Sequence, residues 1–128
     1  MQPTPDDIDL YEQARAAAAN AHAPYSRFAV GAALRTAGGT VVTGVNVENS
    51  SYGLSCCAER TAVFAAVTAG HRQFTAIAVH ADAESAPPCG ACRQVLAEFA
   101  PDLRVIWRRQ GALAVTDLSQ LLPDSFHL

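Results

Sequence analysis

The first stretch of the chain has hydrophobic residues at the spacing of an α-helix. This periodicity runs from Thr4 to about Ala21 and is followed by Pro24, which ends it. Thr4 can cap the helix, and Pro5 suits the first helical position. The pattern therefore predicts an amphipathic helix at the start of the chain.

Short apolar runs separated by glycine, proline and polar clusters predict strands, and two stretches led by cysteine predict helices. A turn signal at 37–40 joins the first two strands as a hairpin, and Gly70 is a natural helix end. After the first helix, the expected elements are strands over 28–34 and 40–45, a loop over 46–55, a helix from Cys56 or Cys57 to Ala69, a strand over 74–81, a helix over 89–99, a strand over 103–108, a candidate fifth strand over 112–115, and a short helix capped by Thr116 that ends at Leu122.

Strands that alternate with helices predict one sheet with helices on both faces, a three-layer α/β/α sandwich. The opening hairpin makes the expected five-stranded sheet mixed rather than fully parallel. The 128 residues fit a single domain over 1–128. A chain of this size can bury enough surface to fold without a disulfide or a metal.

Composition excludes several classes of protein. The charged fraction is too low for a disordered chain, and no apolar run has the length of a membrane span. The formal net charge is −3 and all basic residues are scattered arginines, which argues against nucleic-acid binding. Residues 1–7 lack the features of a secretory signal, so we expect a cytoplasmic, reducing setting in which disulfides are rare.

The four cysteines form two tight pairs, Cys56–Cys57 and Cys89–Cys92. Such spacing suits metal ligation or redox chemistry. Both pairs lie where a helix begins, and a helix N-terminus favours the thiolate that binds metal. If the two helices start side by side, Cys57, Cys89 and Cys92 converge as three ligands. Three protein ligands leave one position for water, as in a catalytic zinc site. Glu59, in the first helical turn, could then reach that water.

These motifs, together with the Asn46–Asn49 segment, resemble the small tetrameric cytidine deaminases, in which a glutamate acts as general acid and base beside a zinc held by cysteines. The resembling segments are Pro24–Phe28, Gly44–Glu59, Arg60–Ala62, Pro88–Val95 and Leu121–Pro123. The resemblance implies deamination of cytidine and 2'-deoxycytidine to uridine and 2'-deoxyuridine, with one zinc ion per chain. It also implies a homotetramer, free nucleoside and water as partners, no nucleic acid or membrane, and a role in pyrimidine salvage.

The resemblance further assigns roles to individual residues. It makes Cys57, Cys89 and Cys92 the zinc ligands and Glu59 the residue that moves protons between water, ring N3 and the leaving amine. In this assignment Asn46 and Glu48 bind the ribose hydroxyls, Phe28 packs on the pyrimidine, and Tyr52 and Phe126 reach toward a neighbouring subunit's site. The substrate-binding residues so implied are Phe28, Asn46, Glu48, Tyr52, Ala58 and Phe126.

Charge gives Arg60 a role. Three thiolates around Zn²⁺ leave a net negative charge, which weakens the effect of the metal on the pKa of water. The helix N-termini offset part of this charge, and Arg60 is the natural neighbouring cation. Cys56 is expected to be structural or a loop thiol near the site, because two adjacent residues rarely point at one metal.

Other functions stay open from the sequence. A blasticidin S deaminase shares the zinc motif, but lacks the Asn46–Glu48 segment and the arginine at position 60. The Cys89–Cys92 spacing also fits a thiol redox protein, although that leaves Cys57 and Glu59 unexplained. A structural zinc domain would need a fourth ligand, for which Cys56 is the obvious candidate. His22, His71, His80 and His127 match no ligand spacing and are expected to be surface or packed residues.

Overall fold

A mixed sheet of five strands organises the molecule. The computed structural model describes residues 1–128, and the strand order is β2-β1-β3-β4-β5. The parallel pair is β3 with β4, whereas β1–β2, β1–β3 and β4–β5 are antiparallel. The strands are β1 (Val30–Thr36), β2 (Val41–Val45), β3 (Phe74–Ala81), β4 (Arg104–Arg109) and β5 (Ala112–Asp117).

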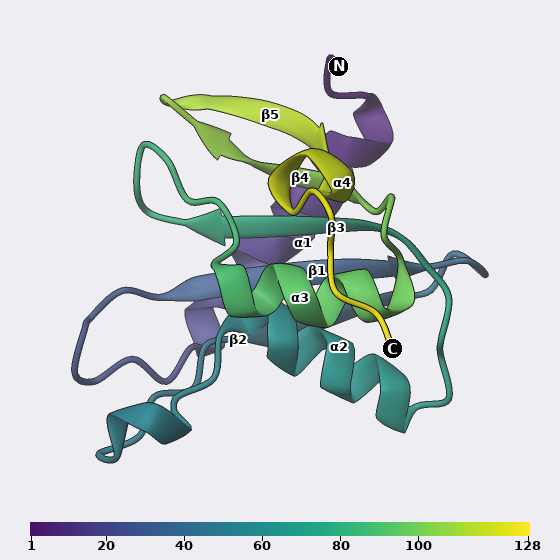
Figure 1. Ribbon diagram of the computed structural model, residues 1–128. Helices are drawn as coiled ribbons and strands as arrows, with labels where there is room; N and C mark the ends of the chain where they lie inside the picture. Colours follow the sequence, from purple (N-terminus) through teal and green to yellow (C-terminus); the bar gives the residue numbers. More distant parts are fainter.

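Helices cover both faces of this sheet, which confirms the predicted three-layer sandwich. Figure 1 shows α1 behind the sheet and α2 and α3 in front of it. The helices are α1 (Pro5–Ala17), α2 (Ala58–Thr68), α3 (Gly90–Phe99) and α4 (Leu118–Leu121). None of them is long and apolar enough to cross a membrane.

The core is divided into two parts by the sheet. Successive residues of a strand point to opposite faces. Ala32 and Leu34 of β1 therefore pack with α2 and α3, whereas Ala33 packs with Leu10 and Ala14 of α1. Both faces of the central strands are buried, which explains why the sequence shows apolar runs instead of strict alternation.

Two glycines allow the helices to approach the sheet closely. A Cβ atom at Gly31 in β1 would lie 2.0 Å from the Ala14 carbonyl oxygen of α1. A Cβ atom at Gly44 in β2 would lie 2.6 Å from the Ala58 carbonyl oxygen, in the first turn of α2. Gly44 therefore sets how deeply the first turn of α2 lies on the sheet.

Several predicted element boundaries differ from the observed ones by a few residues. The first helix ends at Ala17 and continues as a 3₁₀ turn over Ala18–Asn20, instead of reaching Ala21 as a regular helix. The predicted strand from Phe28 begins only at Val30. The Asn46 side chain accepts a hydrogen bond from the Val30 amide and donates one to the Phe28 carbonyl, so these backbone groups are not available for strand pairing.

Thr116 does not cap the last helix. It lies within β5, where its hydroxyl accepts a hydrogen bond from the Trp107 indole at 3.1 Å, and α4 follows Asp117 instead. By contrast, the capping box at Thr4 and the left-handed backbone of Gly70 (φ +97°) confirm those two helix-boundary predictions.

Candidate metal and catalytic site

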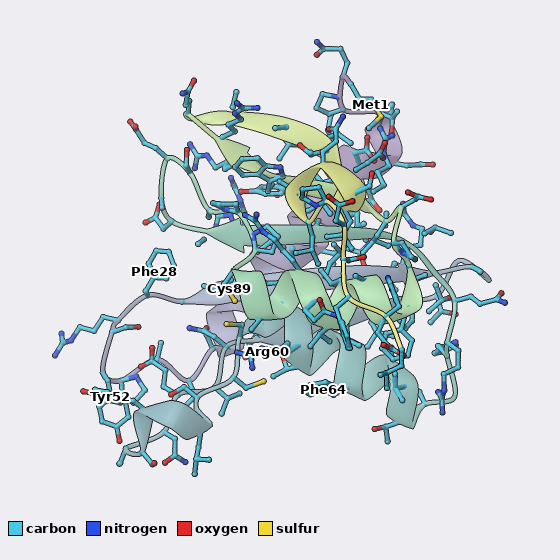
Figure 2. All side chains as sticks on the ribbon, viewed as in Figure 1. Met1, Phe28, Tyr52, Arg60, Phe64 and Cys89 are labelled. Atoms are coloured by element: carbon cyan, nitrogen blue, oxygen red, sulfur yellow. The ribbon has the colours of Figure 1, made fainter.

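Three cysteine sulfurs meet where α2 and α3 begin. Cys57 and Cys89 are the N-cap residues of α2 and α3, and Cys92 lies in the first turn of α3. The Sγ–Sγ distance is 3.8 Å between Cys57 and Cys89 and 3.3 Å between Cys89 and Cys92, and the three sulfurs lie within 4.8 Å of one another. Figure 2 shows Cys89 at the start of α3, with further sulfur atoms beside it. The convergence expected from the sequence is therefore observed.

These sulfurs fit a tetrahedral zinc ion. Two zinc–sulfur bonds of about 2.3 Å at a tetrahedral angle separate their sulfurs by about 3.8 Å. Contact with the Cys92 thiol, together with the Arg60 guanidinium and the Cys89 thiol, lowers the pKa of Cys57 to about 5, despite its partial burial. The pKa of Cys92 is raised, because its thiol faces that of Cys57 and is buried. A divalent cation between the three sulfurs would allow all three to ionise, so the donor set suits a metal ion.

Arg60 is next to this cluster. Its Nη2 donates to Cys57 Sγ at 3.3 Å, and its Nε is buried without a hydrogen-bond partner. The guanidinium thus lies against the sulfurs, as the charge argument predicts, and Figure 2 shows Arg60 close to Cys89. Contact with Cys57 raises the pKa of Arg60, which keeps it positively charged.

Glu59 lies beside the sulfurs in the wall of a cavity of about 390 Å³. Only 4% of the residue is exposed, and burial raises the pKa of its carboxyl group. A carboxyl group whose pKa moves toward neutrality can both take and give a proton. Ala58, which is fully buried, lines the same cavity together with Cys57 and Cys89.

Phe28, Asn46 and Glu48 also line this cavity. The Asn46 side chain accepts from the Val30 amide at 2.9 Å and donates to the Phe28 carbonyl at 2.8 Å. One Nδ2 hydrogen of Asn46 therefore stays free for a ligand. Figure 2 shows Phe28 on the loop that leads into β1. The structure thus gathers these three candidates and the sulfur cluster around one space.

Tyr52 and Phe126 do not line the cavity of their own chain. Tyr52 is 75% exposed on a 3₁₀ turn, Tyr52–Leu54, and its ring lies 6.0 Å from that of Tyr25. Phe126 is 67% exposed in the tail, and its carbonyl accepts from Gln94 on α3 at 3.0 Å. Their assignment to a neighbouring subunit's site stays a prediction.

Cys56 is not part of the sulfur cluster. Its backbone pairs with Val47, and burial raises the pKa of its thiol. The fourth ligand that a closed structural zinc site would need is therefore not supplied by Cys56.

Sequence reasoning missed Ser26 and residues 85–87, which also line the cavity. Ser26 stands within the resembling segment Pro24–Phe28, but its contacts are with Glu48, 22 positions along the chain. Residues 85–87 belong to the loop after β3. No local pattern marks such residues, because the fold brings them to the cavity.

Comparisons with known proteins agree with this site. A family model described as the cytidine and deoxycytidylate deaminase zinc-binding region matches residues 4–107. The cytidine deaminase of Halalkalibacterium halodurans is 51% identical, with 91% of each chain covered. A crystal structure of cytidine deaminase from Burkholderia pseudomallei superposes with a TM-score of 0.89 at 52% identity and covers 93% of this chain and 98% of that one. For contrast, the blasticidin-S deaminase of Bacillus cereus is 32% identical, covering 73% of this chain and 74% of that protein. The chain therefore belongs to the zinc-binding family of cytidine and deoxycytidylate deaminases.

Proposed function

We propose that this protein hydrolyses cytidine and 2'-deoxycytidine to uridine and 2'-deoxyuridine with release of ammonia. One observation carries the proposal: a three-sulfur metal site and a buried glutamate, Glu59, share a cavity with Phe28, Asn46 and Glu48. The high identity to enzymes named cytidine deaminase supports the same conclusion.

The chemistry divides between the metal and Glu59. Zinc held by Cys57, Cys89 and Cys92 supplies a Lewis acid that lowers the pKa of water. Glu59 takes a proton from the attacking water, passes it to ring N3, and later delivers a proton to the amino group that leaves C4. Burial disfavours the ionised form of this carboxyl group, and the raised pKa makes the protonated form accessible as well.

The remaining residues hold the nucleoside in place. Phe28 is 44% exposed, and its ring offers an apolar face for the pyrimidine. Asn46 donates its free Nδ2 hydrogen to a ribose hydroxyl, and the Glu48 carboxylate accepts from one. Ala58 forms part of the apolar wall beside Glu59.

The competing functions account for fewer of these features. A thiol redox protein would use Cys89 and Cys92 and leave the third sulfur, the guanidinium of Arg60 and Glu59 without a role. A blasticidin S deaminase is disfavoured because Asn46, Glu48 and Arg60 are all present and the identity to that enzyme is lower.

The test is conversion of cytidine by the purified, zinc-loaded protein, followed by the loss of cytidine absorbance and by ammonia release. We expect turnover of cytidine and 2'-deoxycytidine, and little or none of blasticidin S. Reduction of insulin disulfides by the same preparation, without cytidine turnover, would favour the redox function instead.

We also propose that the protein works as a homotetramer whose sites are completed by neighbouring chains, with Tyr52 and Phe126 reaching across. The homotetramer is supported by the large apolar side chains that a single chain leaves exposed, which are a common sign of association between chains. These include Tyr25, Phe28, Val47, Tyr52, Leu54, Phe64 and Phe126.

The proposal extends to a setting in the reducing cytoplasm and to pyrimidine nucleoside salvage. Four free cysteines, three of them clustered, fit a compartment that keeps thiols reduced.

A further inference from the structure

The loop before β1 folds over the segment that carries Glu48. The His22 amide donates to the Asn46 carbonyl at 3.0 Å, and the Glu48 amide donates to the His22 carbonyl at 2.8 Å. This pairing brings Ser26 next to the Glu48 side chain at the cavity wall. We propose that Ser26 is a positioning residue that aims the Glu48 carboxylate at a single sugar hydroxyl of the substrate, an inference that rests on the proposed nucleoside function.

The direction of the Ser26 hydroxyl is fixed by its two partners. The Phe28 amide donates to Ser26 Oγ at 3.0 Å, so that oxygen serves there as acceptor. The single hydroxyl hydrogen is left for Glu48 Oε2, to which Ser26 Oγ donates. The result is a chain of donors that runs from the Phe28 backbone through Ser26 to the carboxylate.

Glu48 has little accepting capacity left. A carboxylate offers about four lone-pair directions, two on each oxygen. Oε1 already accepts from the Tyr25 and Ser26 amides, at 3.0 and 3.1 Å, and Oε2 accepts from the Ser26 hydroxyl. One direction on Oε2 stays free, so Glu48 can take one further donor. Ser26 determines where that direction points.

These hydrogen bonds also keep Glu48 ionised. The side-chain and backbone donors of Ser26 lower the pKa of the Glu48 carboxyl group, with a smaller contribution from the Tyr25 amide. An ionised carboxylate can only accept hydrogen bonds, which suits a sugar hydroxyl that donates.

The same hydroxyl links the two parts of the substrate site. Arg27, between Ser26 and Phe28, has a left-handed backbone (φ +57°). The hydrogen bond from the Phe28 amide to Ser26 closes the turn around it, as serine hydroxyls do in turns. Ser26 therefore holds the backbone of the residue proposed to contact the base while it orients the residue proposed to contact the sugar.

Replacement of the hydroxyl alone tests this role. In Ser26→Ala the Tyr25 and Ser26 amides still bind Oε1, so the loop keeps its tether to Glu48, while Oε2 loses its donor and the Phe28 amide loses its acceptor. Ser26→Thr restores a hydroxyl. Ser50→Ala is the matched control, because the Ser50 hydroxyl lies 2.6 Å from the Tyr25 hydroxyl and does not contact Glu48.

Steady-state kinetics with cytidine and with 2',3'-dideoxycytidine gives the functional result. We expect Ser26→Ala to raise KM for cytidine about tenfold, with kcat within about twofold, as loss of a hydrogen bond to a charged group implies. Ser26→Thr restores KM, and Ser50→Ala resembles the wild type. Ser26→Ala raises KM for the dideoxy analogue much less than KM for cytidine, because the analogue has no sugar hydroxyl at the 2' or 3' position to lose its contact with Glu48. An unchanged KM for cytidine, or an equal rise for both nucleosides, would overturn the proposal.

A second measurement does not depend on deaminase activity. In a ¹³C NMR titration of the Glu48 carboxyl, we expect its pKa to be higher in Ser26→Ala than in the wild type and in Ser50→Ala. An unchanged Glu48 pKa in Ser26→Ala would refute the role of the hydroxyl. If the wild type fails to convert cytidine, the proposed function fails, and this titration still decides whether Ser26 controls Glu48.

Discussion

Three sulfur atoms within 4.8 Å concentrate negative charge when they bind a metal as thiolates, and Arg60 is the basic side chain in contact with them. Its Nη2 donates to the Cys57 sulfur, and such contacts tune the electron density that a ligand gives to its metal. Arg60 is therefore expected to sustain the metal's effect on water rather than to touch the substrate.

Arg60→Ala tests this charge balance. We expect a folded protein whose turnover, or zinc affinity, falls by about tenfold to a hundredfold, because contacts behind the ligands have effects of that size. Zinc content per chain and kcat for cytidine measure it, with the exposed Arg109→Ala as the control. Wild-type zinc content and turnover in Arg60→Ala would show that the helix N-termini are sufficient.

The sulfur count around the metal is a separate prediction. X-ray absorption at the zinc edge is expected to give three sulfurs and one lighter atom, since Cys56 lies outside the cluster. Four sulfurs would indicate a closed structural site instead.

The candidate metal site could be predicted from the sequence because its ligands lie in short, recognisable motifs. Cys57 and Cys89 cap the starts of two helices and Cys92 lies in the first turn of the second, so the placement of the two helices brings the sulfurs together. The link between Ser26 and Glu48 could not be predicted in this way. It depends on a loop folding over a segment more than 20 residues away, and serine is common in any loop.

At the scale of elements, two glycines set the distances between helices and sheet. Gly31 faces α1 and Gly44 faces α2, on opposite faces of the sheet. The α2 contact matters for the site, because the first turn of α2 carries Glu59 and its N-cap is Cys57. In addition, the Thr61 hydroxyl lies 2.7 Å from the Val45 carbonyl and fastens this turn to β2.

Replacing Gly31 and Gly44 by alanine, one at a time, distinguishes an effect on stability from an effect on catalysis. Gly31→Ala and Gly44→Ala both force backbone to move and are each expected to lower the free energy of unfolding by about 1–3 kcal/mol. Only Gly44→Ala is expected to lower kcat as well, by about tenfold or more, because misplaced catalytic groups are costly.

Urea unfolding and cytidine turnover measure the two effects. Gly38→Ala is the control, since the nearest atom to its Cβ would be 4.0 Å away. An equal loss of kcat in Gly31→Ala and Gly44→Ala would contradict a specific role of the α2 contact.

Element boundaries followed from the sequence where a segment is regular. The strand over 74–81 was predicted with its observed limits, because an apolar run stands between polar loops. The strand predicted from Phe28 was wrong at its start, since Asn46 binds the backbone there from 18 residues away. A long-range side-chain contact of this kind leaves no trace in local hydrophobicity.

At the scale of the whole molecule, the Asp7–Arg104 ion pair ties α1 to β4. Arg104 binds both carboxylate oxygens, at 2.9 and 2.7 Å, and lowers the pKa of Asp7 to about 2. A carboxylate whose folded pKa is depressed stabilises the fold above its unfolded pKa, and this stabilisation is lost as pH falls toward the folded value.

Asp7→Asn is therefore expected to be less stable than the wild type by about 2 kcal/mol at pH 6, with the difference shrinking between about pH 4 and pH 2. Comparison of urea unfolding at several pH values cancels effects that both proteins share, including the acid sensitivity of the thiolates. A difference that stays constant down to pH 2 would show that the ionised pair contributes nothing.

The proposal that neighbouring chains complete each other's active sites can be tested with mixtures of two variants. Sedimentation should give four times the 13.5 kDa mass of one chain. If Tyr52 acts in a neighbour's site, Tyr52→Ala chains mixed with Glu59→Gln chains regain activity, because some sites receive Glu59 from one chain and Tyr52 from the other. Activity that never exceeds the sum of the separate variants would contradict sharing through Tyr52.

Glu59 is proposed to move protons beside a three-cysteine zinc site. Zinc-loaded wild type and Glu59→Gln, assayed side by side on cytidine, test this role. Glu98→Gln, on the exposed face of α3, controls for the loss of a carboxylate. We predict that all three proteins bind one zinc per chain, that wild type and Glu98→Gln convert cytidine to uridine, and that Glu59→Gln is slower by about 10²–10⁴. Turnover by Glu59→Gln at the wild-type rate, or no turnover by the zinc-loaded wild type, would contradict this role of Glu59.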